Sequence, residues 1–359
     1  MFNTKRSTVP TSEEDAEMLE LGFRTDEQLK NLKNSNRTLK IAVSVLGLLV
    51  TVLCAEFAAV IHRFSVVEYL TEHVLIKQPT EYNVEVLTRN VQVVPVHSHN
   101  DEMRYVPFFD AYTKGCNSIE ADTWYLPEHP DTLLVGHNKG YLRKDNTLDN
   151  LYLDHLWHSL IDANSESEDD KINGIFYNSP EATTYFYIDV KSDGIKTLEL
   201  LEEKLKEFLD RDFLTTFNQT SGEFIEGPLT VVITGAYPYD YIVSKDFRYM
   251  FIDAPLNLLE DEADLYPARN VSIFASCSLE QITGLKNKPW NYVHGITEDD
   301  LEKVSSTLAR AHEIGLQTRI WDTPAWPLYV RNGVWRQLIE SGADYLNVDD
   351  LKAATGELW

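Results

Sequence analysis

Eight short apolar runs, each rich in β-branched or aromatic residues and each ending in polar or charged residues, constrain this chain more than any other feature. They lie at residues 91–97, 117–124, 183–191, 229–235, 248–254, 270–276, 316–321 and 343–349. Helix-like segments such as 198–209 and 301–314 separate most of them. Buried strands that alternate with helices are typical of a parallel sheet. Their number and spacing predict a (β/α)8 barrel of the α/β class over residues 91–359. A doubly wound open sheet is the alternative, but no glycine-rich phosphate loop follows the first run.

A longer apolar stretch at residues 41–61 has the length needed to cross a bilayer. Glu56 is its one charged residue, and a buried core helix is the alternative interpretation. The expected order along the chain is a polar tail, a transmembrane helix, a linker and the barrel, at residues 1–40, 41–62, 63–90 and 91–359.

Basic residues are unevenly distributed around this stretch. One, Arg63, follows it closely, whereas four precede it: Lys30, Lys33, Arg37 and Lys40. The positive-inside bias therefore predicts a cytosolic N-terminus and a lumenal or extracellular barrel. The triplets that begin at Asn218 and Asn270 fit glycosylation acceptors of such a domain.

The charge balance excludes some partners. With 57 acidic and 32 basic side chains, the formal net charge is −25. This argues against nucleic acid as the main partner, and against docking on anionic lipid by charge alone. A phosphate-containing substrate would need a cation to mediate its binding. The three cysteines are too few and too widely spaced to define a disulfide framework or a zinc ribbon.

Acidic residues occur at the ends of two of the predicted strands. Glu120 and Asp122 lie two residues apart on the second run, so both side chains point to the same face. Asp189 and Lys191 end the third run with the same spacing. Reactive groups of such barrels collect at the carboxyl ends of the strands. We therefore expect the three carboxylates to converge on a hard cation, Mg²⁺ or Ca²⁺.

Histidines occur near the same end of the barrel. His97 and His99 follow the first run, and His137 follows a short apolar stretch at residues 133–136. Two imidazoles beside a hard cation suit phosphodiester cleavage, one as general base and one as general acid. We predict His97 and His137 as this pair, because His97 directly ends its run, and keep His99 as an additional candidate.

This set of residues resembles the PLC-like phosphodiesterase barrels, particularly the glycerophosphodiester phosphodiesterases and the sphingomyelinase D enzymes, over residues 91–351. The resemblance implies that His97 and His137 are catalytic and that the three carboxylates bind metal. It further implies that Lys191, Asn100 and Trp321 contact the substrate. The order His-Ser-His-Asn-Asp after a membrane segment most resembles the fungal "altered inheritance of mitochondria protein 6" family, whose name suggests a mitochondrial association.

The sequence departs from the glycerophosphodiesterase pattern in two places. His97-Ser98-His99 stands in place of His-Arg-Gly, and a Pro-Glu-Asn motif is absent. The substrate is therefore left open.

Three functions are compatible with these residues. The first is a membrane-anchored, divalent-metal-dependent phosphodiesterase that hydrolyses a glycerophosphodiester or phospholipid. The second is a catalytically degenerate barrel that acts as a tethered binding module. The third is a zinc hydrolase of the amidohydrolase type, in which His97 and His99 would both bind metal. Those barrels need further histidines after strands five and six, and runs 248–254 and 270–276 end without them.

Overall fold

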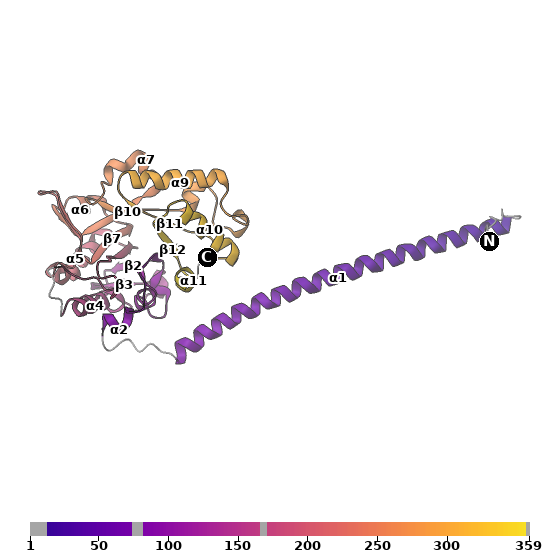
Figure 1. The fold of residues 1–359 in the computed structure, drawn as a ribbon, viewed down its shortest axis with the longest axis horizontal. Coiled ribbons are helices and arrows are strands. Elements are labelled where there is room, and N and C mark those ends of the chain that lie inside the picture. Colours follow the sequence, from indigo (N-terminus) through magenta and orange to yellow (C-terminus); the bar gives the residue numbers. More distant parts are fainter. Residues whose placement is uncertain (1–12, 74–81, 166–170, 357–359) are drawn as a thin grey trace. The chain divides into compact units, whose positions relative to one another are not determined.

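The computed structural model of the chain describes residues 13–73, 82–165 and 171–356. The chain divides into two compact units, residues 1–76 and 77–359. The first contains one long helix, and the second is a barrel that contains the hydrophobic core (Figure 1).

The N-terminal helix, α1, runs from Glu13 to His73. Its segment Arg24–Ala59 contains an apolar stretch long enough to cross a membrane, and the side chains of that stretch are not buried by the protein. The helix predicted over residues 41–62 is therefore present. The polar tail predicted over residues 1–40, by contrast, is helical from Glu13 onward. Residues 13–40 contain no proline and are rich in Glu, Leu and Lys, so nothing ends the helix there.

Eight parallel strands form the closed barrel, in agreement with the predicted fold. They are β1 (Val94–Ser98), β2 (Cys116–Leu126), β4 (Thr184–Val190), β7 (Leu229–Gly235), β9 (Met250–Pro255), β10 (Ser272–Ser278), β11 (Gln317–Trp321) and β12 (Tyr345–Val348). The first strand closes the barrel by pairing with both β2 and β12. Each of the eight apolar runs contains or overlaps one of these strands.

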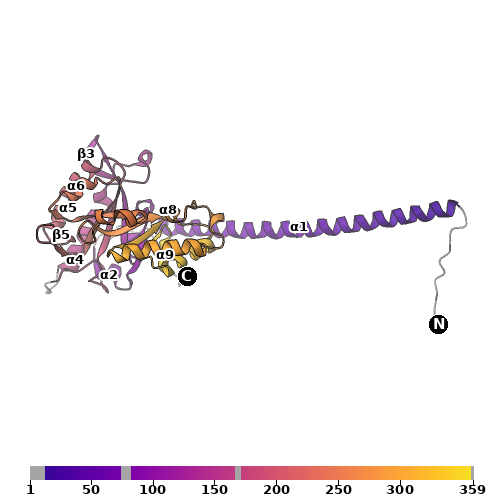
Figure 2. The same ribbon diagram turned by 90° about the horizontal axis from the view of Figure 1, so that it is seen from above.

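Helices surround the barrel (Figures 1 and 2). They are α3 (Phe109–Tyr112), α4 (Asp154–Asn164), α5 (Gly194–Leu209), α6 (Tyr239–Val243), α7 (Leu259–Glu262), α8 (Leu279–Thr283), α9 (Glu298–Glu313), α10 (Leu328–Glu340) and α11 (Leu351–Gly356). The long helix α5 shows how the sequence builds this layer. Its apolar residues Leu198, Leu201 and Leu205 recur at helical spacing and are fully buried. The Asp193 side chain caps its start by accepting from the Lys196 N–H at 3.0 Å.

Four strands and one helix lie outside this regular pattern. Strand β3 (His129–Val135) pairs antiparallel with β2 and forms a hairpin with it, and in Figure 2 it projects from the barrel. Strands β5 (Thr216–Asn218), β6 (Glu223–Ile225) and β8 (Phe247–Arg248) form a separate small sheet. Helix α2 (Val84–Thr88) lies in the predicted linker and is tied to α4, because the Val84 N–H donates to Asp162 Oδ2 at 2.7 Å.

The barrel interior is filled by side chains and is not a pore. Tyr185, Tyr187, Val232, Phe274 and Tyr345 form one buried cluster within it. Their rings meet edge to face, with centroids 4.9 to 5.8 Å apart. The polar residues of the candidate site lie toward the carboxyl ends of the strands.

Candidate active site

The three predicted metal-binding carboxylates come together. Glu120 and Asp122 lie on β2, and Asp189 on β4 is the register partner of Asp122. One carboxylate oxygen from each lies within 4.8 Å of the others. Glu120 and Asp122 are buried, whereas Asp189 is half-buried and faces the opening. An all-oxygen set of this kind suits Mg²⁺ or Ca²⁺.

Lys191 lies beside two of these acids. Its Nζ is 2.6 Å from Asp189 Oδ2 and 3.2 Å from Asp122 Oδ1. Burial would lower the pKa of Lys191, but the two carboxylates outweigh burial and raise it. The ammonium group is therefore charged at neutral pH and offsets part of the negative charge that the acids concentrate here.

Gly235, at the end of β7, makes room for the Asp189 carboxylate. Its φ is +74°, and a Cβ at this position would lie 2.1 Å from Asp189 Oδ1. Any other residue would therefore displace the carboxylate as well as strain the backbone. The sequence analysis did not identify this position as part of the site.

The β2–β3 hairpin brings His137 to the same group of acids. Thr123 pairs with Val135 at the base of the hairpin, and the Gly136 N–H donates to the Asp122 carbonyl at 3.0 Å. The following residue, His137, then places its Nδ1 2.9 Å from Asp122 Oδ2. Its side chain is 50% exposed, so its other ring nitrogen is open to a substrate.

His97 is placed differently from His137, because its side chain is fully buried. Nδ1 lies 2.7 Å from Ser118 Oγ, and Nε2 lies 2.8 Å from Arg319 Nη1 and 3.2 Å from Glu120 Oε2. Burial, together with the Arg319 charge, lowers the pKa of His97 to about 3. A guanidinium can only donate, so Nε2 accepts from Arg319 and the ring proton lies on Nδ1. Both ring nitrogens of His97 are thus engaged inside the protein.

His99 lies nearer the surface than His97. Its side chain is 28% exposed, and its Nδ1 lies 2.9 Å from Asp349 Oδ1. Burial would lower the pKa of His99, but the Asp349 hydrogen bond and the charge of Glu120 raise it. Asn100 adopts a left-handed conformation with φ +47° and directs its amide toward His99 and Asp349, at 3.1 and 3.5 Å. Arg104 donates to the backbone carbonyls of His99 and Asp349, which fixes this pair.

Glu102 is a fourth acid that sequence reasoning missed. It belongs to a second group of possible metal ligands, with Asp122 and His137. Both of its carboxylate oxygens are buried without a hydrogen-bond partner in the part of the chain described. Burial, with the charge of Asp122, raises the pKa of Glu102 to about 8. An orphaned carboxyl beside another acid is what a cation-binding position requires. The sequence signal that could have identified Glu102 was its position three residues after His99.

Arg319 on β11 was also missed, although a charged residue within the run 316–321 was a visible signal. It is 3% exposed, and Nη2 lies 3.2 Å from Asp253 Oδ2. Nε lies 3.1 Å from Ser276 Oγ, and the guanidinium stacks 4.7 Å from the Tyr187 centroid. The positive charge of Arg319 thus compensates the negative charges of the buried Asp253 and Glu120.

The remaining predicted substrate contact, Trp321, ends β11 and is 37% exposed. Among the described side chains, no hydrogen bond links the Trp321 side chain to Glu120, Asp122 or Asp189. The zinc alternative finds no support in the geometry. Neither group of possible metal ligands within the described ranges includes His97 or His99.

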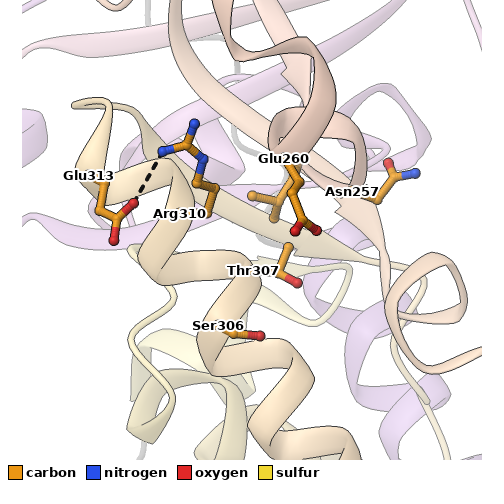
Figure 3. Close-up of a pocket in the computed structure, with 7 residues that line it drawn as sticks. Asn257, Glu260, Ser306, Thr307, Arg310 and Glu313 are labelled. Carbon is orange, nitrogen blue, oxygen red and sulfur yellow. Dashed lines mark hydrogen bonds and ion pairs between the residues drawn. The ribbon is translucent and has the colours of Figure 1, made fainter.

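One surface pocket, of about 330 Å³, lies against α9 and contains none of the predicted site residues (Figure 3). Its lining includes Asn257 and Glu260, which follow β9, and the α9 residue Thr307. Arg310 and Glu313 at its edge form an ion pair at 3.2 Å. This lining contains no histidine to activate its Ser306 and Thr307 hydroxyls, and no group of possible metal ligands within the described ranges, so the barrel end remains the candidate site.

Comparisons with known proteins agree with this geometry. Residues 85–253 match the family model described as an AIM6-like phosphodiesterase domain, a range that includes His97, His137 and all four acids. Fold and family together therefore define a phosphodiesterase-type barrel. No solved structure matches the chain.

Curated relatives identify the family. "Altered inheritance of mitochondria protein 6" of Eremothecium gossypii is 40% identical over 286 residues, covering 77% of this chain and 73% of that protein. The homolog from Arthroderma benhamiae is 36% identical, covering 75% and 85%. The protein from Saccharomyces cerevisiae strain S288c is 35% identical, covering 77% and 74%. The chain belongs to the altered inheritance of mitochondria protein 6 family, as the resemblance predicted.

Proposed function

We propose that this protein is a membrane-anchored, divalent-metal-dependent phosphodiesterase that hydrolyses a glycerophosphodiester or a phospholipid. One observation carries the proposal: Glu120, Asp122 and Asp189 bring carboxylate oxygens within 4.8 Å of one another at the end of the barrel where His137 contacts Asp122. Helix α1 supports the anchor, since its segment Arg24–Ala59 could cross a membrane. The family name supports a mitochondrial association, and the excess of basic residues before residue 41 supports a lumenal or extracellular barrel.

The residues at the site fit a hard cation. Glu120, Asp122 and Asp189 would hold it, and the orphaned Glu102 carboxyl would supply a further oxygen. A bound Mg²⁺ or Ca²⁺ would neutralise charge on a phosphoryl oxygen. Burial would raise the pKa of Glu120, but the Arg319 charge keeps that pKa well below its usual range. Glu120 is therefore ionised and ready to bind a cation at neutral pH.

His99 and His137 are the pair best placed for proton transfer. His137 would accept the proton of the attacking oxygen, since it is held by Asp122 and half exposed. His99 would donate a proton to the alcohol that leaves as the phosphorus–oxygen bond breaks. Its hydrogen bond to Asp349 favours the protonated ring that this role requires. In this scheme His97, with its ring nitrogens engaged by Ser118 and Arg319, is a positioning residue that holds the Arg319 guanidinium beside Glu120.

Activity of the purified full chain tests the proposal. We expect hydrolysis of glycerophosphocholine or lysophosphatidylcholine that EDTA abolishes and Mg²⁺ restores. His99→Ala and His137→Ala should each lower kcat by about 10²–10⁴-fold without a change in thermal unfolding, as expected for loss of a general acid or base. His158→Ala, at an exposed position on α4, is the matched control. No turnover of any phosphodiester, or metal-independent turnover, would overturn the proposal.

A tethered binding module is the second candidate. The complete burial of His97 favours it, because the resemblance assigns catalysis to that residue. In that case the same assays would find no turnover, while isothermal titration would still detect Mg²⁺ binding that Asp122→Asn removes.

A further inference from the structure

Five aromatic residues of the barrel are conspicuously exposed. Among the described barrel residues, these are the aromatic side chains with the largest exposed fractions, from 62% to 84%: Tyr105, Tyr141, Trp290, Trp326 and Tyr329. We call these five the aromatic rim. Exposing several large aromatic side chains to water is unfavourable unless a partner covers them.

All five residues of the aromatic rim lie at one end of the barrel. Tyr105 follows β1, Tyr141 follows the β2–β3 hairpin, and Trp326 follows β11. Tyr329 lies in the first turn of α10, directly after that last segment. Trp290 lies between α8 and α9, in a segment that is joined to the end of β11 because the Asn287 side chain donates to Asp322 Oδ1 at 2.9 Å. In a parallel barrel these segments share the end that holds the active site. The less exposed Tyr177 and Phe247, at 50% and 44%, precede β4 and β9 and so belong to the opposite end.

Basic side chains accompany the rim, although the chain carries a net charge of −25. The segment that holds Tyr141, residues 136–146, contains one acid, and the segment that holds Trp290, residues 284–296, contains none. Together they carry five exposed cations: Lys139, Arg143, Lys144, Lys286 and Lys288. We call these two segments the basic loops. None of the five cations forms an ion pair with the described part of the chain.

We propose that the aromatic rim and the basic loops dock on the surface of a phospholipid bilayer and present the active site to lipid headgroups. Tyr and Trp suit this boundary because one edge of the ring is apolar and the other is polar. Lys and Arg beside them suit the phosphate layer. A protein partner would favour a contiguous apolar patch, whereas these aromatic residues come from four separate segments, two of which carry the five cations.

The inference deepens the proposed function and rests on it for the nature of the substrate, which would be a lipid resident in the membrane. The apolar segment of α1 agrees with it, because a chain that crosses a bilayer keeps its barrel at a lipid surface. The overall negative charge does not oppose it, since the basic loops are local exceptions at the end that would approach the lipid.

Tryptophan fluorescence of the full chain tests the docking. All seven tryptophans lie outside residues 1–76, so their emission reports on the barrel and not on the anchor. The chain would be reconstituted in phosphatidylcholine vesicles with a minor fraction of phosphatidylserine, with and without brominated acyl chains. We expect the brominated lipid to quench the emission, and Trp290→Ser combined with Trp326→Ser to remove most of that quenching. The matched control is Trp157→Phe, which should retain the quenching. Trp157 lies on helix α4 and packs on Phe208 and Phe213.

A charge-reversal variant adds a second readout. Lys139→Glu combined with Lys144→Glu should weaken quenching in vesicles that contain phosphatidylserine more than in pure phosphatidylcholine. Quenching that is absent, or that persists in the double tryptophan variant, would overturn the docking. Emission could instead depend on the density of protein in the vesicles and not on bromination. That result would show that a second copy of the chain covers the aromatic rim, and it would overturn the docking as well.

Turnover measured in the same samples separates this inference from the proposed function. Hydrolysis of soluble glycerophosphocholine without quenching would refute the docking alone. Quenching without turnover of any phosphodiester would refute the proposed function alone. The rim variants should leave hydrolysis of the soluble substrate unchanged, because none of their residues belongs to the acid or histidine set.

Discussion

The buried guanidinium of Arg319 governs the electrostatics of the site at the scale of single residues. It donates to Asp253 and His97 and lies 3.9 Å from Glu120. Burial would raise the pKa of Asp253, as it would that of Glu120, and Arg319 opposes this in both residues. Two acids and a histidine inside the barrel therefore depend on one cation.

Removing that cation should destabilise the fold strongly. We expect Arg319→Met to lower the free energy of unfolding by about 3–5 kcal/mol, because Glu120 and Asp253 would be left as uncompensated buried charges. Arg336→Met, at an exposed position on α10, should change it by no more than about 0.5 kcal/mol. Urea titration of the detergent-solubilised chain measures both. Equal effects of the two substitutions would contradict this view of the network.

Sequence reasoning predicted part of the site at this scale. Glu120, Asp122, Asp189 and Lys191 could be predicted, because charged residues at alternate positions of apolar runs must share a face and a partner. Whether His97 or His99 is open to solvent could not be predicted. The answer depends on where β1 ends within the barrel, and Ser98 is its last residue. That end is set by pairing with β2 and β12, which are distant in the sequence.

At the scale of elements, the end of β7 makes room for the proposed metal ligand Asp189. Gly235→Ala would place a Cβ against Asp189 Oδ1. We expect Mg²⁺ affinity to fall by about 10–100-fold, as is usual when the support of a metal ligand is disturbed. Titration of Mg²⁺ by isothermal calorimetry would measure the loss.

The control for this substitution is Gly222→Ala. Gly222 has a similar φ of +71°, but a Cβ there meets nothing within 4 Å. Both variants thus carry the same backbone strain, and Gly222→Ala should bind Mg²⁺ normally. Should both variants lose affinity equally, strain alone would explain the effect and the contact with Asp189 would be irrelevant.

The elements themselves were predicted unevenly, and the reasons are physical. The eight barrel strands were predictable because burial on both faces makes their runs continuously apolar. Strand β3 was not, since it pairs on one edge only and begins with His129, Pro130 and Asp131. The early start of α1 was missed because a polar helix without a packing partner shows no apolar period.

At the scale of the whole molecule, the open question is which side of the membrane holds the barrel. If the barrel is lumenal, Asn218 should be glycosylated, because it ends β5 next to the exposed β5–β6 turn and its Oδ1 only accepts from the N–H groups of Thr220 and Ser221. The Asn270 side chain is instead held by Arg248. Expression in cells followed by endoglycosidase H should give a mobility shift that Asn218→Gln removes and Asn270→Gln does not. A barrel that is unmodified and digested by protease from the cytosolic side would reverse the predicted orientation.

The β2–β3 hairpin has one consequence for how this molecule could change over evolutionary time. Beyond Thr123, β2 leaves its neighbour β4 and pairs with β3 alone, so residues 124–134 form an arm. The base of this arm packs against α5, whereas most residues of its tip, 127–131, are exposed. The register between Thr123 and Val135 is fixed at the foot of this arm, next to Asp122 and His137. Insertions or deletions at its tip can therefore change the surface around the candidate site while the proposed catalytic groups stay in place, so we expect relatives with different substrate preferences to differ in length at this tip.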